Sequence, residues 1–216
     1  MSDHANISGI GAAIPAPNLD TDQIMPKQFL RGIDKAGLDQ GLLYDLRYDA
    51  QHQLRPEFVL NRLAYRGAAI IVGGSNFGCG SSREHAVWGL QQFGIKAVIA
   101  PSFGEIFYSN AMNNRLLLVV LEQADVARIM ADVADPLSSH IEIDVASMTI
   151  KSRSVVASFV LSARHHRMFL EGLDMIGASL SYQHHITAFQ QRHWQARPWL
   201  KNVAHLTRAR LDTSKS

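Results

Sequence analysis

Residues 73–85 gather glycines, hydroxyls and a guanidinium that could together hold an anion, in the order GGSNFGCGSSREH. Glycines allow backbone N–H groups to approach a ligand closely. Arg83 can bind a carboxylate through two parallel hydrogen bonds. The segment lacks the Gly-Lys-Ser/Thr ending of a P-loop and the Gly-x-Ser-x-Gly order of a hydrolase elbow. The residue types therefore indicate a turn that binds a carboxylate.

A strand and a helix are expected to position this turn. Residues 67–72 form a short apolar run between glycines, which is typical of a buried strand. Apolar residues recur at helical spacing over 86–93, so a helix is expected to begin near Ser81 or Ser82 and to end at Gly94. Its N-terminus would add unpaired N–H donors and the positive end of its dipole. Alternatively, Ser81 or Ser82 serves only as a helix cap.

A second polar segment, NLDTDQIMPKQFLRG, occupies residues 18–32. It holds two acids, Asp20 and Asp22, and two bases, Lys27 and Arg31, within one expected loop. These side chains could serve a site together with the glycine-rich turn. The alternative is a solvated turn, because Asn, Asp and Pro favour turns for purely local reasons.

The remaining segments predict an α/β fold of one domain over residues 1–195, followed by a basic C-terminal tail over 196–216. Strands and helices are expected to alternate at 97–100, 103–113 with Ser102 as its cap, 116–121 and 125–133. Such alternation is typical of a parallel core with crossover helices. Residues 141–145 and 155–161 predict added antiparallel strands, and helices are expected over 163–172 and 181–195.

Composition favours a globular cytoplasmic protein. The 216 residues include 47% hydrophobic residues and 21 basic against 19 acidic side chains, which gives no nucleic-acid signature. No apolar run approaches the ~20 residues of a membrane span. No signal peptide is expected, because the first residues lack its basic and apolar regions. From Arg192 onward six basic residues face one acid, Asp212, so the tail is expected to fray or to lie on a partner's surface.

The single cysteine, Cys79, excludes an internal disulfide, and it cannot hold an iron–sulfur cluster, which takes several thiolates. Adjacent histidines, at 165–166 and 184–185, point to different sides of a helix and do not form a metal-binding face. No metal site is therefore expected in this chain.

Together, the two polar segments resemble the small-subunit family of 3-isopropylmalate dehydratase (isopropylmalate isomerase), which is similar to the swivelling domain of aconitase. The motif NFGCGSSREH is highly specific to that superfamily. The resembling pieces cover most of residues 5–190 and are 18–30, 56–60, 76–88, 99–110, 114–117 and 172–177. The resemblance implies an aconitase-like swivelling domain with β/α layers.

The resemblance also implies an activity: a hydro-lyase that interconverts 2-isopropylmalate and 3-isopropylmalate through 2-isopropylmaleate, in leucine biosynthesis. Such an enzyme acts on a small branched hydroxy-dicarboxylate and is active only with a large subunit, in a heterodimer or higher assembly. That large subunit would carry the 4Fe–4S cluster, which acts on the leaving hydroxyl. Alternatives are a related hydratase for citraconate, a dimethylmalate or homoaconitate, and a carboxylate-binding module without catalysis.

Residue roles follow from the resemblance where the chain matches the family. Ser81 would be the catalytic base, Arg83 would bind a substrate carboxylate, and Asp22 would orient other groups or take part in proton transfer. The substrate-binding residues would be Gly80, Ser82, Lys27 and Arg31. His85 and Asp20 would support these groups without touching substrate. The chain departs from many relatives at Val87, Arg115, Leu118 and Arg164, which bears on substrate identity more than on reaction class.

Overall fold

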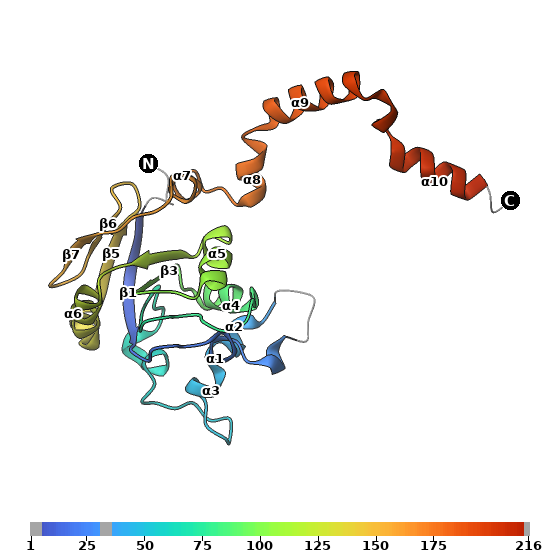
Figure 1. The fold of residues 1–216 in the computed structure, drawn as a ribbon. Helices are drawn as coiled ribbons and strands as arrows, with labels where there is room; N and C mark the ends of the chain where they lie inside the picture. The colour runs from blue at the N-terminus through green and yellow to red at the C-terminus, as the bar shows by residue number, and fades with distance from the viewer. Residues whose placement is uncertain (1–5, 31–35, 214–216) are drawn as a thin grey trace. The chain divides into compact units, whose positions relative to one another are not determined.

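A mixed seven-stranded sheet carries the first part of the chain (Figure 1). The computed structural model describes residues 6–30 and 36–213, and the chain divides into two compact units, Met1–Asp174 and Met175–Ser216. The strand order is β4-β3-β2-β1-β5-β6-β7. Its arrangement confirms the α/β class, with a parallel half and an antiparallel half meeting at β1.

The parallel half consists of β1 (Asn6–Ile14), β2 (Ile70–Gly73), β3 (Ala97–Ala100) and β4 (Leu117–Val120). Every residue of β2 and β3 is buried, as expected of strands covered on both faces. The sequence predicts β2, β3 and β4 but not β1, where glycines weaken the strand signal. Gly11 lets the side chain of Ile141 approach the strand, since a Cβ would lie 2.6 Å from it.

The antiparallel half consists of β5 (His140–Asp144), β6 (Thr149–Lys151) and β7 (Val156–Ser158). In β5, Ile141 and Ile143 are buried whereas His140 and Glu142 are exposed, so the predicted period-two alternation is confirmed. The sequence does not predict β6, which is only three residues long and pairs with both neighbours.

Helices cover both faces of the parallel half (Figure 1). One face carries α6 (Gln123–Ala134), which contacts β1, β2 and β3 through its buried side chains. The other face carries α4 (His85–Phe93) and α5 (Glu105–Asn113), and α7 (Ala163–Glu171) follows β7 in the chain. The sequence predicts these four helices; the expected first residue is correct for α7 and is wrong by two to four residues for α4, α5 and α6.

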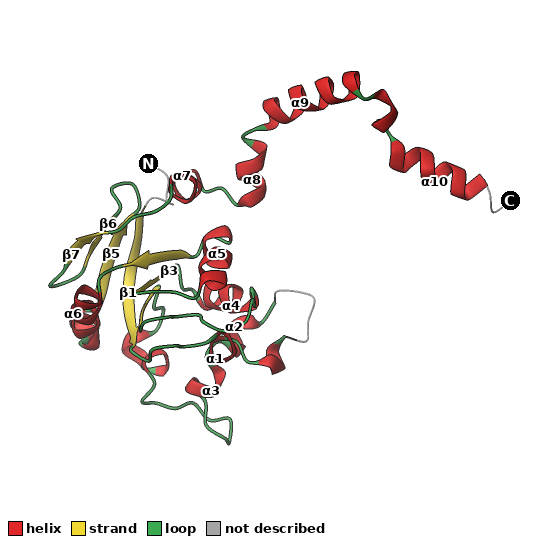
Figure 2. Cartoon of the chain, in the orientation of Figure 1, coloured by secondary structure: helices red, strands yellow, loops and turns green. Residues whose placement is uncertain are grey.

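Between β1 and β2 the described residues form short helical turns (Figure 2). They are α1 (Thr21–Ile24), α2 (Leu38–Gly41), α3 (Tyr44–Arg47) and three 3-10 turns at Lys27–Phe29, Val59–Asn61 and Leu63–Tyr65. The turn α1 matters most for function, because it lies within the polar segment that follows β1.

The second unit is helical, with α8 (Met175–Leu180), α9 (Gln183–Ala196) and α10 (Val203–Thr213). None of these helices has a buried residue. Helix α10 lies in the basic tail, where residues that favour helices, such as alanine, leucine and arginine, are frequent. The division into a domain over 1–195 and a tail over 196–216 stays a prediction. In the described part of the chain, no helix is long and apolar enough to cross a membrane.

Candidate active site

The candidate site lies where two loops leave neighbouring parallel strands at the same edge of the sheet. Loop A, residues 15–22, follows β1 and includes the first two residues of α1. Loop B, residues 74–84, follows β2 and leads into α4. Ile14 and Gly73 are partners in the β1–β2 register, so the two loops start side by side. In open α/β sheets, the carboxyl ends of parallel strands are the usual place for a ligand.

Main-chain and side-chain hydrogen bonds join the two loops along their length. The links, in chain order, are Asn18 N–H to Ser75 O (2.8 Å), Asn76 Nδ2 to Asn18 Oδ1 (2.8 Å), Gly78 N–H to Leu19 O (2.7 Å) and Thr21 N–H to Cys79 O (2.8 Å). The two polar segments that the sequence singles out are therefore parts of one structure.

Ser81 is held by Thr21 across the loop boundary. The Ser81 amide donates to Thr21 Oγ1 at 3.1 Å, and the two hydroxyl oxygens lie 3.1 Å apart. Thr21 is 1% exposed whereas Ser81 is exposed, so a buried side chain fixes the backbone of an exposed residue. Sequence reasoning missed Thr21, whose only signal was its place between Asp20 and Asp22.

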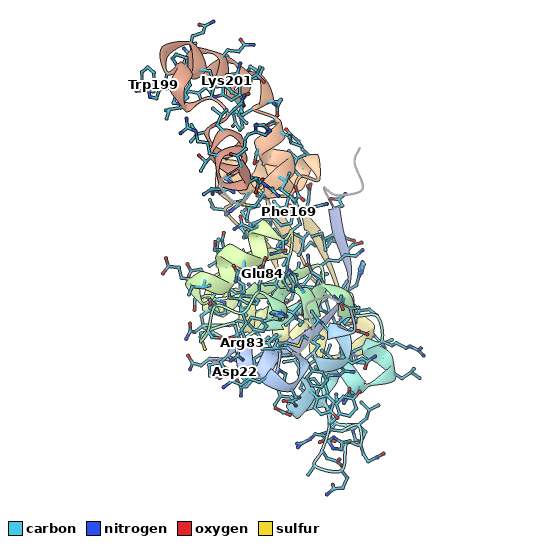
Figure 3. All side chains as sticks on the ribbon, turned by 90° about the vertical axis from the view of Figure 1, so that its right-hand side faces the viewer. Asp22, Arg83, Glu84, Phe169, Trp199 and Lys201 are labelled. Atoms are coloured by element: carbon cyan, nitrogen blue, oxygen red, sulfur yellow. The ribbon has the colours of Figure 1, made fainter. Side chains whose placement is uncertain are left out.

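Arg83 and Asp22 form an ion pair, the next link along the same two loops (Figure 3). The Arg83 side chain is 18% exposed and the Asp22 side chain is 50% exposed. The sequence treats Arg83 and Asp22 as separate contributors to a site, and the structure brings them together. The guanidinium is thus already aimed at a carboxylate, supplied here by the protein itself.

Asp20 caps the N-terminus of α1. Its carboxylate accepts from the Gln23 amide at 2.7 Å, and the Gln23 side chain accepts from the Asp20 amide at 3.1 Å. This reciprocal pair is a capping box. By fixing the first turn of α1, Asp20 fixes the adjacent Thr21 and Asp22.

Two glycines of loop B adopt left-handed backbone conformations, for different reasons. Gly78 has φ +73°, and a Cβ there would overlap the ring of Phe107 on α5. Gly80 has φ +96°, and its Cβ would lie 3.4 Å from Thr21 Oγ1.

Among the described residues, the amides of Gly80 and Ser82 have no protein acceptor, whereas those of Gly78 and Ser81 do. These two open amides are backbone donors that an anion could use.

The helix after the turn begins at His85, so the expectation of a start at Ser81 or Ser82 is wrong. Neither serine caps the helix, because Thr21 holds Ser81, and the carbonyl of Ser82 accepts from Asn110 Nδ2 at 3.4 Å. Glu84 occupies the N-cap position without a side-chain capping bond. Ser102 also does not cap α5; its hydroxyl accepts from the Asn76 amide at 2.8 Å, and Gly104 is the cap residue.

Asn114, at the end of α5, joins the two helices behind the site. Its Nδ2 donates to Glu84 Oε1, and its Oδ1 accepts from Trp88 Nε1 at 3.1 Å. Its carbonyl accepts from Gln91 Nε2 at 2.6 Å. The sequence does not single out this side chain. Its signal was its place in one of the segments that resemble the family.

Other predicted residues lie farther from this network. The His85 ring packs against Trp88 on the first turn of α4, with ring centroids 4.8 Å apart. Lys27 is exposed on the 3-10 turn after α1 and has no ion pair within residues 6–30 and 36–213. Arg31 lies outside the described residues.

All four departures from the family lie outside the two loops. Val87 and Leu118 are buried in the core, so they alter packing rather than ligand contacts. Arg164 is exposed on α7, where solvent can hydrate its guanidinium. Arg115 precedes β4 with φ +64°, a conformation that glycine adopts more easily.

In the part of the chain that the structure describes, no group of three or more His, Cys, Asp or Glu side chains could hold a metal ion. Cys79 is a partly buried free cysteine whose carbonyl joins loop B to Thr21. This donor set does not fit an iron–sulfur cluster.

Comparisons with known proteins agree with this geometry. Residues 1–124 match the model of the aconitase C-terminal domain. The chain is 67% identical over 211 residues to 3-isopropylmalate dehydratase small subunit 1 of Chromobacterium violaceum, covering 98% of this chain and all of that protein. It is 44% identical over 204 residues to the 3-isopropylmalate dehydratase small subunit of Phenylobacterium zucineum, covering 94% of this chain and all of that protein.

A solved structure supports the same relationship. The 3-isopropylmalate dehydratase of Methanocaldococcus jannaschii superposes with a TM-score of 0.59 at 26% identity, over 86% of this chain and 99% of that one. The sequence relatives span nearly the whole chain and include both loops of the candidate site. The chain therefore belongs to the family of 3-isopropylmalate dehydratase small subunits, within the aconitase C-terminal domain superfamily.

Proposed function

We propose that the chain is the small subunit of a heteromeric hydro-lyase that interconverts 2-isopropylmalate and 3-isopropylmalate through 2-isopropylmaleate, in leucine biosynthesis. The observation that carries this proposal is the 67% identity to a protein of that name over its full length. The joined loops support it, because they place Ser81 near Arg83 at the edge of the sheet where a small acid could bind.

Ser81 acts as the base in this reaction. Its Oγ removes the proton from a carbon next to the one that carries the hydroxyl, and the hydroxyl leaves to give the unsaturated diacid. The proton and the hydroxyl, together one water, then add back with their positions exchanged, which gives the isomer. A serine oxygen suits this role only where positive charge and fixed donors stabilise its deprotonated form. Arg83, two residues away in a partly buried position, supplies such a charge.

Arg83 binds a carboxylate of the substrate. The guanidinium is held in place by its ion pair with Asp22. Because Asp22 is half exposed, its carboxylate can move aside or share the guanidinium N–H donors when the substrate binds. The amides of Gly80 and Ser82 and the Ser82 hydroxyl complete the anion site. Lys27 and Arg31 contribute to the choice of the branched substituent through their positive charges.

The large subunit completes the active site. An iron–sulfur cluster needs several thiolates, and this chain supplies only Cys79, so the 4Fe–4S cluster belongs to the partner. Catalysis then requires both subunits, in the cytoplasm. Subunit assembly brings the partner to the exposed side of Ser81 and Ser82.

Turnover of 2-isopropylmalate tests the proposal directly. The ultraviolet absorbance of the unsaturated intermediate is followed anaerobically with this chain alone, with the large subunit alone, and with the two mixed. Activity in the mixture only is the expected result. The assigned substrate would change if the assembled, cluster-loaded mixture were inactive on 2-isopropylmalate but active on citraconate, a dimethylmalate or homoaconitate. A mixture silent on all of these would contradict the enzyme assignment.

A further inference from the structure

Thr21 contacts Ser81 at three atoms, which no other side chain in the described network does. Thr21 Oγ1 lies 3.1 Å from the Ser81 amide nitrogen, 3.1 Å from Ser81 Oγ and 3.2 Å from the Ser81 carbonyl oxygen. Because the threonine is 1% exposed, water cannot take its place.

The hydrogen count at Thr21 distinguishes the two protonation states of Ser81. A threonine hydroxyl has one proton and two lone pairs. One lone pair accepts from the Ser81 amide, so the single proton goes either to the Ser81 carbonyl or to Ser81 Oγ. While Ser81 Oγ keeps its own proton, it can donate to Thr21, which then donates to the carbonyl. Once Ser81 Oγ has lost its proton, it can only accept.

We infer that Thr21 is a positioning residue that stabilises deprotonated Ser81, by turning its hydroxyl proton from the Ser81 carbonyl to Ser81 Oγ. The inference rests on the proposed role of Ser81 as the base. No bond breaks at Thr21, because the hydroxyl only rotates about its Cβ–Oγ1 bond. A hydrogen bond to a charged oxygen is roughly twice as strong as one between neutral groups. The exchange therefore favours the state that removes the substrate's proton.

The fold holds Thr21 in place from both loops. Its amide donates to the Cys79 carbonyl at 2.8 Å, and the Asp20 capping box fixes the turn that it begins. Gly80, which precedes Ser81, adopts φ +96°, a backbone conformation that favours glycine. A hydroxyl held this firmly can donate to either Ser81 oxygen without moving the backbone.

Thr21→Val and Thr21→Ser test the inference in the enzyme assembled with its large subunit. Valine keeps the shape and removes the hydroxyl, whereas serine keeps the hydroxyl. We expect Thr21→Val to lower kcat about 10- to 100-fold, the range for losing a hydrogen bond to a charged group. KM should change less than about twofold, because Arg83 still binds the carboxylate. Thr21→Ser should restore most of kcat.

A matched control comes from Ser102. Its hydroxyl also accepts from an amide of loop B, that of Asn76 at 2.8 Å, yet it does not touch Ser81. We expect Ser102→Ala to keep the parent kcat and KM. If Thr21→Val fails to fold, Thr21→Ser and Thr21→Ala give the same comparison, since they too differ only in the hydroxyl.

Three results would overturn the inference. The first is a parent-like kcat in Thr21→Val while Ser81→Ala is inactive, which would leave the base assignment intact. The second is an equal loss in the valine and serine variants with a raised KM, which would make Thr21 a structural tie only. The third is normal turnover in Ser81→Ala, which would remove the proposed base itself.

Discussion

Gly78→Ala should destabilise the protein strongly, for two reasons that can be separated. Alanine in the left-handed region costs about 1 to 2 kcal/mol relative to glycine. In addition, the new methyl would overlap the buried ring of Phe107, and overpacking a core costs about 1 to 3 kcal/mol. The sum is about 2 to 5 kcal/mol of unfolding free energy, a large fraction of the ~5–15 kcal/mol that holds a typical domain.

Gly67→Ala is the matched control. Gly67 has φ +78°, close to the +73° of Gly78, but a Cβ at Gly67 would meet nothing within 4 Å. Its replacement should cost only the conformational share, about 1 to 2 kcal/mol. The difference between the two variants isolates the contact with Phe107.

Urea unfolding of both variants measures these costs, through the transition midpoint at constant slope. In the enzyme assembled with its large subunit, Gly78→Ala should also lower kcat/KM, because a shift of loop B moves Ser81 and Arg83. Equal destabilisation of the two variants would refute the reasoning from the Phe107 contact. A parent-like stability of Gly78→Ala would refute both parts of it.

Two further predictions concern charge. Arg83→Lys should lower kcat/KM about 10- to 100-fold, because a point charge cannot replace two parallel hydrogen bonds to a carboxylate; steady-state kinetics measure this, and unchanged values would count against carboxylate binding. Asp132→Asn should destabilise the fold at neutral pH and progressively less as the pH falls below about 4. Burial raises the pKa of Asp132, but hydrogen bonds from Ser152 and Ser154 and the charge of Arg153 outweigh it, so the pKa is lowered on folding. The stability that the carboxylate contributes is therefore present above its unfolded pKa and lost as the pH falls through its folded one. Urea unfolding across this pH range checks it, and a cost independent of pH would contradict the assignment.

The sequence predicts the buried parts of the fold well, because apolar runs report burial directly. The strands β2, β3 and β4 follow from such runs, and the helix α6 follows from apolar residues at helical spacing. Strand β1 is not predicted, because its glycines reflect packing against a residue that is distant in the sequence. Gly11 admits the side chain of Ile141, about 130 residues later, and no local pattern reveals that approach.

The candidate site divides in the same way. The sequence indicates an anion-binding turn and its arginine, since residue types alone carry that chemistry. It does not predict where α4 begins, because contacts with Thr21 and Asn110 hold loop B out of the helix. It also overlooks Thr21 itself, whose importance lies in a contact 60 residues away.

Ser81→Ala in the assembled enzyme tests the central claim most directly, namely that the joined loops present Ser81 as the base beside Arg83. Assembly is measured by size-exclusion chromatography, and turnover of 2-isopropylmalate by the absorbance of its unsaturated intermediate. We predict normal assembly with kcat lowered about 100- to 10,000-fold, the usual range for losing a general base. An assembled Ser81→Ala enzyme with the parent kcat would contradict the account.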